Sequence, residues 1–284
     1  MKLVTFKNGD IESYGVDAGE GILDVGSDFK DRYPDLKSVL SDNACDALKA
    51  AADQQAAALP YEEIEFLPVI PNPSKILCIG INYEAHRQET GRPVSDYPTV
   101  FMRFADTLVG HDQPILKPLA SDRVDWEGEL AVIIGRPGRA IPKDEALNHV
   151  AGYACLNDVS IRDWQRHTGQ FSPGKNFPTT GPFGPAMVTV DEIPDPQALE
   201  LITRVNGEEM QRTPTDDLIF DVPALINYIS TFTPLRPGDV ISTGTPGGVG
   251  DARKPPVYMK HGDNVEVEIS SIGILKNPIV NEEI

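Results

Sequence analysis

The stretch VDWEGELAVIIG, residues 124–135, joins an apolar run to a cluster of acidic residues. The run that ends at Gly135 is typical of a buried β-strand. Asp125, Glu127 and Glu129 precede it at every second position, and alternate residues of a strand point to the same face. Burying such like charges costs on the order of several kcal/mol for each uncompensated ion. This face of the predicted strand is therefore either solvated or holds a cation.

The chain has 284 residues, 40% of them hydrophobic, which predicts one large domain with at most a small additional unit. Cys45, Cys78 and Cys155 are odd in number and lie far apart, so they predict neither a disulfide framework nor a zinc site. The segment MKLVTFKNGD reaches polar residues too soon to be expected to act as a signal peptide, and no apolar run approaches the roughly 20 residues that cross a bilayer. We therefore expect a soluble protein of the reducing cytoplasm, without a membrane partner.

The formal net charge is -18, from 25 basic and 43 acidic residues. Such a surface repels phosphate backbones and anionic lipid headgroups, so nucleic acid is not expected as a partner. An anionic substrate would need a metal ion or a few lysine and arginine side chains that reverse this field locally.

The first 70 residues predict a small N-terminal unit. Residues 2–7 and 11–16 alternate apolar and polar positions around NGD, which predicts a β-hairpin. The segment DLKSVLSDNACDALKAAADQQ, which begins at Asp35, has helical periodicity. The proline-rich LPVIPNPSK, residues 67–75, then separates this unit from a second domain over residues 71–284.

The second domain is predicted to consist mainly of short strands separated by strong turn signals. The strand ILCIG opens it, VNGEEM and RPGDVIST mark turns, and helices are expected near PKDEALNHV and DVPALINYISTF. Because strands and helices do not alternate regularly, we predict an α+β, mainly β, mixed sandwich or roll rather than a doubly wound sheet. The glycine-rich STGTPGGVG, residues 242–250, lacks the ending of a phosphate-binding loop and is as compatible with a tight turn as with a functional loop.

Three carboxylates form the first candidate site. Glu127 and Glu129 alone are more typical of a solvated strand face, but Asp158 closes a second apolar segment, VAGYACLN, about 30 residues later. Asp158 could equally cap the helix expected behind it. Three carboxylates without clustered cysteine or histidine suit Mg²⁺, Mn²⁺ or Ca²⁺ rather than zinc.

His86 and Glu89 form a second candidate group, because residues three apart meet on a helical turn. A carboxylate beside an imidazole fixes its tautomer and raises its basicity, as in a general base, although this spacing also arises by chance on helix surfaces. Arg103 and Lys175 lie in loop-flanked positions where they could hold an anion, or could be ordinary surface residues.

Together these segments resemble the fumarylacetoacetate hydrolase family. CIGINYEAHRQE, VFMRF, DWEGELAVIIG, NDVSIRDWQ, GKNFPTTGPFGP, VNGEEMQ and RPGDVISTGTPGGVG occur in the order and spacing of that family, over roughly residues 72–280. The resemblance implies a homodimeric mixed β-roll in which Glu127, Glu129 and Asp158 bind Mg²⁺ or a similar ion. Asp125 would lie on the same face, behind the ligands or in solvent.

The resemblance also implies roles for residues around the ion. His86 and Glu89 would form a catalytic dyad on a mobile segment, and Lys175 would stabilise developing negative charge. The positions that match substrate contacts are Arg103, Gln165 and Thr245. RHTGQFSPG, residues 166–174, lacks the tyrosine found before the lysine in members that act on fumarylacetoacetate, and Pro178 replaces an aspartate or glycine, so the substrate is expected to differ.

These features predict a divalent-metal-dependent hydrolase that cleaves a carbon–carbon bond in a small anionic 2,4-dioxo acid of the acylpyruvate or fumarylpyruvate type. The ion would polarise the 2-oxo group and hold the enolate that forms. The same chemistry would serve an oxaloacetate-type decarboxylase, a 2-hydroxyhepta-2,4-diene-1,7-dioate isomerase or a 2,4-dioxo-3-deoxy sugar acid hydrolase. A non-catalytic metal-binding dimer is the alternative from a different class.

Overall fold

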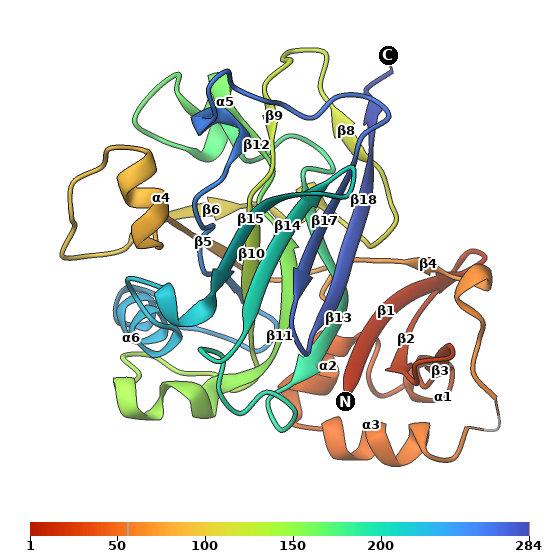
Figure 1. Ribbon diagram of the computed structural model, residues 1–284. Helices are drawn as coiled ribbons and strands as arrows, with labels where there is room; N and C mark the ends of the chain where they lie inside the picture. Colours follow the sequence, from red (N-terminus) through yellow and green to blue (C-terminus); the bar gives the residue numbers. More distant parts are fainter. Residues whose placement is uncertain (56, 284) are drawn as a thin grey trace.

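The computed structural model describes residues 1–55 and 57–283, and its core is a sandwich of two β-sheets (Figure 1). The larger sheet has the order β3 (Ile22–Asp24), β2 (Ile11–Asp17), β1 (Lys2–Asn8), β13 (Gly181–Thr189), β11 (Val150–Asn157), β10 (Gly128–Ile134), β16 (Val240–Ser242), β5 (Ile76–Gly80) and β6 (Thr99–Arg103). Two short strands join it at the side: β4 (Glu65–Phe66) pairs with β1, and β7 (Leu108–Val109) pairs with β13.

The smaller sheet has the order β15 (Glu208–Pro214), β14 (Glu200–Val205), β17 (Asn264–Ile269), β18 (Gly273–Asn281) and β8 (Ile115–Lys117). It packs against β10, β11 and β13, as Figure 1 shows. A separate pair joins β9 (Val124–Asp125) to β12 (Ser160–Ile161). The predicted mixed, mainly β architecture is thus confirmed.

Strand β10 lies at the centre of this sandwich. Leu130, Val132 and Ile134 pack into the core between the sheets, whereas Ala131 and Ile133 pack into the core beside the N-terminal unit. A strand covered on both faces needs apolar residues at every position, and this explains the continuous run LAVII.

The N-terminal hairpin is confirmed, and its strand β1 pairs with β13 of the larger sheet. The predicted helical segment contains two helices, α2 (Leu36–Ser41) and α3 (Cys45–Ala52), which follow the short α1 (Gly26–Phe29). The break occurs because Asn43 adopts a left-handed φ of 53°, a conformation that ends a helix. The boundary near residue 70 stays a prediction.

The remaining helices are α4 (Glu84–Glu89), α5 (Arg162–Gln165) and α6 (Val222–Phe232). Helix α6 was predicted, and it begins where Asp221 accepts a hydrogen bond from the backbone N–H of Ala224. The helix expected near PKDEALNHV is a 3-10 helix, Lys143–His149, rather than an α-helix. Within the described ranges, no helix combines the length and the apolar character needed to cross a membrane.

Candidate metal centre and active site

The acidic stretch is not one continuous strand. Strand β9 ends at Asp125 and β10 begins at Gly128, because the backbone between them bonds to the next acidic loop instead. The N–H of Glu127 donates to Asn157 Oδ1 at 3.0 Å, and the Glu127 carbonyl accepts from the N–H of Asp158 at 2.9 Å. These two bonds bring Asp158 beside Glu127, although about 30 residues separate them.

Asp125 is fully buried, which excludes the solvated position that was one expectation for it. Its carboxylate accepts hydrogen bonds from Arg162 Nε at 2.7 Å and from the N–H groups of Gly250 and Asp251 at 2.7 and 2.9 Å. Arg162 Nη1 also lies 2.6 Å from Glu127 Oε1. Asp125 therefore supports the acidic cluster from behind, through Arg162.

Glu127, Glu129 and Asp158 each place one carboxylate oxygen within 4.8 Å of the others, and all three residues are buried. Oxygen ligands at about 2.0–2.6 Å from a divalent ion lie up to about 4–5 Å from each other. The spacing and chemistry of these three carboxylates therefore fit a hard divalent cation such as Mg²⁺, Mn²⁺ or Ca²⁺.

Buried cations offset part of this negative charge. Lys175 Nζ lies 2.6 Å from Glu127 Oε2 and 2.6 Å from Asp158 Oδ2. Burial alone raises the pKa of Glu127, but Lys175 and Arg162 outweigh it and lower that pKa to about 2. Glu127 is thus held as an anion.

Glu129 has a different environment. Its carboxylate accepts from the Ser242 hydroxyl and, at 2.9 Å, from the N–H of Gly244. Burial, followed by the charges of Asp158 and Glu127, raises the pKa of Glu129 well above its ordinary value. It is the member of the cluster whose charge most needs an added cation.

Arg103 ends strand β6 and lies behind the carboxylates rather than in the cavity. Its side chain is fully buried, and its Nε donates to Asp158 Oδ1 at 2.9 Å. Nη1 donates to Thr180 Oγ1 at 3.0 Å. In this structure Asp158 and the surrounding loop bind the guanidinium group, which does not line the cavity. The substrate contact expected for Arg103 stays a prediction, and the geometry favours a role in positioning Asp158.

The predicted dyad lies on helix α4. Nδ1 of the buried His86 lies 3.3 Å from Glu89 Oε2, and Glu89 also accepts from the N–H of Gly248 at 3.1 and 3.2 Å. This leaves Nε2 of His86 to act within the cavity that His86 lines. Helix α4 is thus attached to the glycine-rich loop by the same carboxylate that orients the imidazole.

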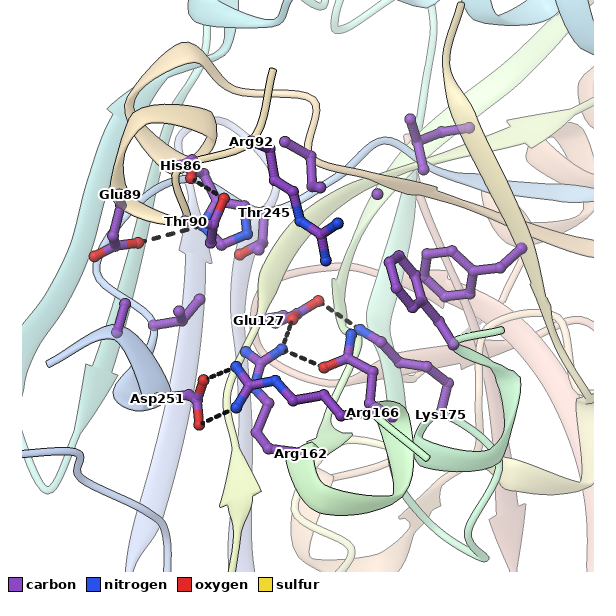
Figure 2. A pocket seen from close by; sticks show the side chains of 18 of the residues that line it. His86, Glu89, Thr90, Arg92, Glu127, Arg162, Arg166, Lys175, Thr245 and Asp251 are labelled. Atoms are coloured by element: carbon purple, nitrogen blue, oxygen red, sulfur yellow. Dashed lines mark hydrogen bonds and ion pairs between the residues drawn. The ribbon is translucent and has the colours of Figure 1, made fainter. Parts of the chain in front are cut away.

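One cavity of about 290 Å³ brings most of the predicted residues together (Figure 2). The predicted residues that line it are His86, Glu89, Glu127, Glu129, Gln165, Lys175 and Thr245. Gln165 accepts from Arg162 Nη1 at 3.0 Å, and Thr245 donates to the Gly128 carbonyl at 3.0 Å. Because the glycine-rich loop supplies Thr245 and binds Glu89 and Glu129, it belongs to the site. The catalytic and substrate roles of these residues stay predictions.

The sequence reasoning missed four charged residues of the cavity, Arg92, Arg162, Arg166 and Asp251. Arg162 stands four residues after Asp158 in NDVSIRDWQ, and that proximity was the signal available for it. Arg166 forms an ion pair with Asp251, in which Nη1 lies 3.3 Å from Oδ1. Nothing local in the sequence predicts this pair, because 85 positions separate its members.

Comparisons with known proteins agree with this geometry. The family model described as fumarylacetoacetate (FAA) hydrolase C-terminal matches residues 75–280. The chain is 42% identical to oxaloacetate tautomerase fahd2, mitochondrial, of Xenopus laevis, over 99% of this chain and 90% of that protein. It is 40% identical to oxaloacetate tautomerase FAHD2A, mitochondrial, of Bos taurus, over 99% of this chain and 92% of that protein.

Two solved structures share the fold. Fumarylacetoacetate hydrolase from Exiguobacterium antarcticum matches with a TM-score of 0.85 and 33% identity, over 99% of this chain and 100% of that one. Maleylpyruvate hydrolase from Sphingobium sp. SYK-6, in complex with manganese(II) and pyruvate, matches with a TM-score of 0.83 and 28% identity, over 100% of both chains. The resemblance inferred from the motifs is thereby confirmed, and the chain belongs to the fumarylacetoacetate hydrolase family.

Proposed function

We propose that this protein is an enzyme that moves a proton at the carbon beside the 2-oxo group of a small organic acid, with tautomerisation of oxaloacetate as its first candidate reaction. The observation that carries the proposal is a single cavity lined both by the His86–Glu89 dyad and by Glu127, Glu129 and Lys175. The mitochondrial oxaloacetate tautomerases of Xenopus laevis and Bos taurus support it, because each matches 99% of this chain.

Glu127, Glu129 and Asp158 would hold the divalent ion, with Mg²⁺ as the first candidate and Mn²⁺ or Ca²⁺ as alternatives. The manganese in the Sphingobium structure supports an ion of this kind. When bound, such an ion supplies a Lewis acid that polarises the 2-oxo group of the substrate.

The side chains of the cavity supply the proton transfer. Glu89 would accept a hydrogen bond from the Nδ1–H of His86, which leaves Nε2 unprotonated. Nε2 could then take a proton from the substrate carbon and deliver it to the 2-oxo oxygen. The Lys175 ammonium group would stabilise negative charge as it develops on that oxygen. The apolar wall formed by Phe101 and Phe171, whose rings lie 5.7 Å apart, would limit the access of water.

Hydrolysis of a 2,4-dioxo acid is the second candidate, and the Sphingobium maleylpyruvate hydrolase with bound pyruvate favours it. In that reaction His86 would deprotonate a water molecule instead of the substrate carbon. Decarboxylation, isomerisation and cleavage of dioxo sugar acids would use the same carboxylates and remain alternatives. A non-catalytic metal-binding protein is less well supported, since it would not need the dyad or Lys175 beside the carboxylates.

The deciding experiment compares reactions on one metal-loaded preparation. The decay of the absorbance of enol oxaloacetate measures tautomerisation. The release of pyruvate from a panel of acylpyruvates measures hydrolysis. Oxaloacetate, an unsaturated dioate and a dioxo sugar acid are added as substrates for the remaining reactions. We expect the tautomerase rate to exceed the others and to vanish when a chelator removes the ion. Pyruvate release from an acylpyruvate as the fastest reaction would favour the hydrolase, and no turnover with any ion would favour the non-catalytic alternative.

Assembly and location are separate proposals. The homodimer implied by the family resemblance is supported by two exposed apolar side chains at the edge of the larger sheet: Met102 of strand β6 is 56% exposed, and Phe104, just after this strand, is 59% exposed. Light scattering at several protein concentrations tests it, and a monomer throughout would contradict it. The cytoplasmic location stays a prediction, since the two tautomerases are named as mitochondrial.

A further inference from the structure

Four arginine and lysine side chains line the inner cavity, and three of them have acidic partners. Arg162 is paired with Asp125 and Glu127, Lys175 with Glu127 and Asp158, and Arg166 with Asp251. The guanidinium group of Arg92 makes no hydrogen bond or ion pair within the described part of the chain. In a protein with a net charge of -18, a cavity cation without a carboxylate partner can receive an anion from outside.

The backbone of Arg92 is nevertheless held in place. Its N–H donates to the Arg87 carbonyl at 3.0 Å, and its own carbonyl accepts from Arg87 Nη1 at 2.6 Å. Arg87 is fixed in turn by two bonds to Glu84, at 2.8 and 2.6 Å. The Arg92 side chain extends from this anchored loop toward Glu127 and Arg166, as Figure 2 shows. Anchoring the backbone reduces the entropy lost when such a side chain binds a ligand.

Arg92 also marks the junction of two cavities. The inner cavity of about 290 Å³ is lined by Glu127, Glu129 and Lys175, and an outer cavity of about 620 Å³ adjoins it. Both are lined by Gly80, Ile81, Arg92, Gln165, Arg166 and Phe171. A ligand whose 2-oxo acid group lies at Lys175 would extend toward this junction.

We propose that Arg92 binds the second carboxylate of the substrate and so selects 2-oxo dicarboxylic acids over 2-oxo monocarboxylic acids of the same shape. This inference rests on the proposed function, because it assumes that the 2-oxo acid group binds beside the acidic cluster. A guanidinium group matches a carboxylate with two parallel hydrogen bonds. Arg166 is less available to bind this carboxylate, because its guanidinium group already forms an ion pair with Asp251. Because Arg92 is exposed, we expect a preference of only about tenfold.

The test uses two inert ligands that share an oxamate head and differ only at the far end. N-oxalylglycine carries a second carboxylate, and N-isobutyloxamate carries an isopropyl group of similar shape in its place. Calorimetry with the Mg²⁺-loaded full-length protein measures both dissociation constants for the wild type, Arg92→Met and Arg92→Lys. Arg212→Met is the matched control, because Arg212 pairs with Glu200 and Glu209 and does not line either cavity.

We expect the wild type and Arg212→Met to bind N-oxalylglycine about tenfold more tightly than N-isobutyloxamate. Arg92→Met should lose this preference without weaker binding of N-isobutyloxamate, and Arg92→Lys should retain part of it. A preference that persists in Arg92→Met, or that is absent from the wild type, would overturn the inference. If the preference depends on Arg92 but no 2-oxo acid is turned over, only the proposed reaction fails; if neither ligand binds, both proposals fail.

Discussion

The carboxylate of Glu89 accepts hydrogen bonds from the backbone N–H of Gly248, at 3.1 and 3.2 Å, and so connects helix α4 to the glycine-rich loop. The same carboxylate lies 3.3 Å from His86 Nδ1. Gly248 has a φ of +100°, and a Cβ atom there would lie 2.2 Å from the Met210 carbonyl oxygen. Glycine is therefore required at this position, and the Glu89 side chain both contacts the imidazole and links helix α4 to the loop.

Two substitutions of Glu89 should separate these roles. Glu89→Gln retains an oxygen acceptor for Gly248 but removes the negative charge beside His86, so kcat should fall about tenfold while α4 stays closed. Glu89→Ala removes both interactions, so kcat should fall further and amide exchange within residues 84–89 should increase. Steady-state kinetics and hydrogen–deuterium exchange measure the two effects. Unchanged exchange in Glu89→Ala would mean that the Gly248 bond does not hold the helix.

Replacement of His86 should separate the reactions that share the acidic cluster. In His86→Ala, tautomerisation and any acylpyruvate hydrolysis should fall by roughly a hundredfold to ten-thousandfold, the usual contribution of a positioned general base. Oxaloacetate decarboxylation should persist, because loss of carbon dioxide requires neither an activated water nor proton abstraction from carbon by a base. Rates at saturating Mg²⁺ in the folded variant check this. Equal losses in all reactions would assign His86 to substrate or metal binding.

Glu127 and Glu129 should differ in their effects on the metal-free protein. Glu127→Gln removes a negative charge that Lys175 and Arg162 both contact, and it should lower the free energy of unfolding by about 3 kcal/mol. Glu129→Gln changes a carboxyl group that forms no ion pair among the described residues, so the free energy of unfolding should stay nearly unchanged. Both variants should lose Mg²⁺ binding. Urea unfolding with a chelator and calorimetry provide the measurements, and undiminished Mg²⁺ affinity in both variants would refute the metal assignment.

Arg103 should affect the ion rather than the substrate. Because its Nε donates to Asp158 Oδ1 from a fully buried position, Arg103→Met should leave that carboxylate poorly oriented and weaken Mg²⁺ binding by at least about tenfold. The Michaelis constant, measured at saturating Mg²⁺, should change little. A raised Michaelis constant with normal Mg²⁺ affinity would instead support the substrate contact expected from the sequence.

The three thiols should react in two classes. Burial raises the pKa of Cys155 to about 12 and that of Cys78 well above its ordinary value, so neither forms the reactive thiolate at pH 8. Burial also raises the pKa of Cys45, but this side chain is only partly buried, so a thiol reagent can reach it. A thiol reagent should therefore modify one cysteine in the native protein and three after unfolding. Cys45→Ser should abolish the native reaction, and any remaining fast thiol would show that a buried cysteine is accessible.

Local features of the fold could be predicted from the sequence because they depend on neighbours along the chain. The continuous apolar run predicted β10, and the segment DVPALINYISTF predicted α6. Asn206–Gly207, with φ of 53° and 80°, forms the turn expected between β14 and β15. The acidic cluster was also predictable, because Glu127 and Glu129 share a short spacing and Asp158 follows a second apolar segment. Each of these signals lies within a few residues of the element it describes.

The pairing of charges was decided only by the tertiary structure. Arg103 and Asp158 are 55 positions apart, and they meet because β6 and the loop after β11 lie together in the folded chain. The same holds for Glu89 and Gly248, which are 159 positions apart. From the sequence alone, an arginine or lysine could pair with any of many carboxylates. Its partner is decided only when the fold buries the two side chains next to each other. Residue spacing and the family resemblance therefore pointed to the carboxylates and to the His86–Glu89 pair, whereas folding placed Arg103 behind Asp158 and left the Arg92 guanidinium group without a hydrogen bond or ion pair among the described residues, because electrostatic pairing depends on distance in space and not along the chain.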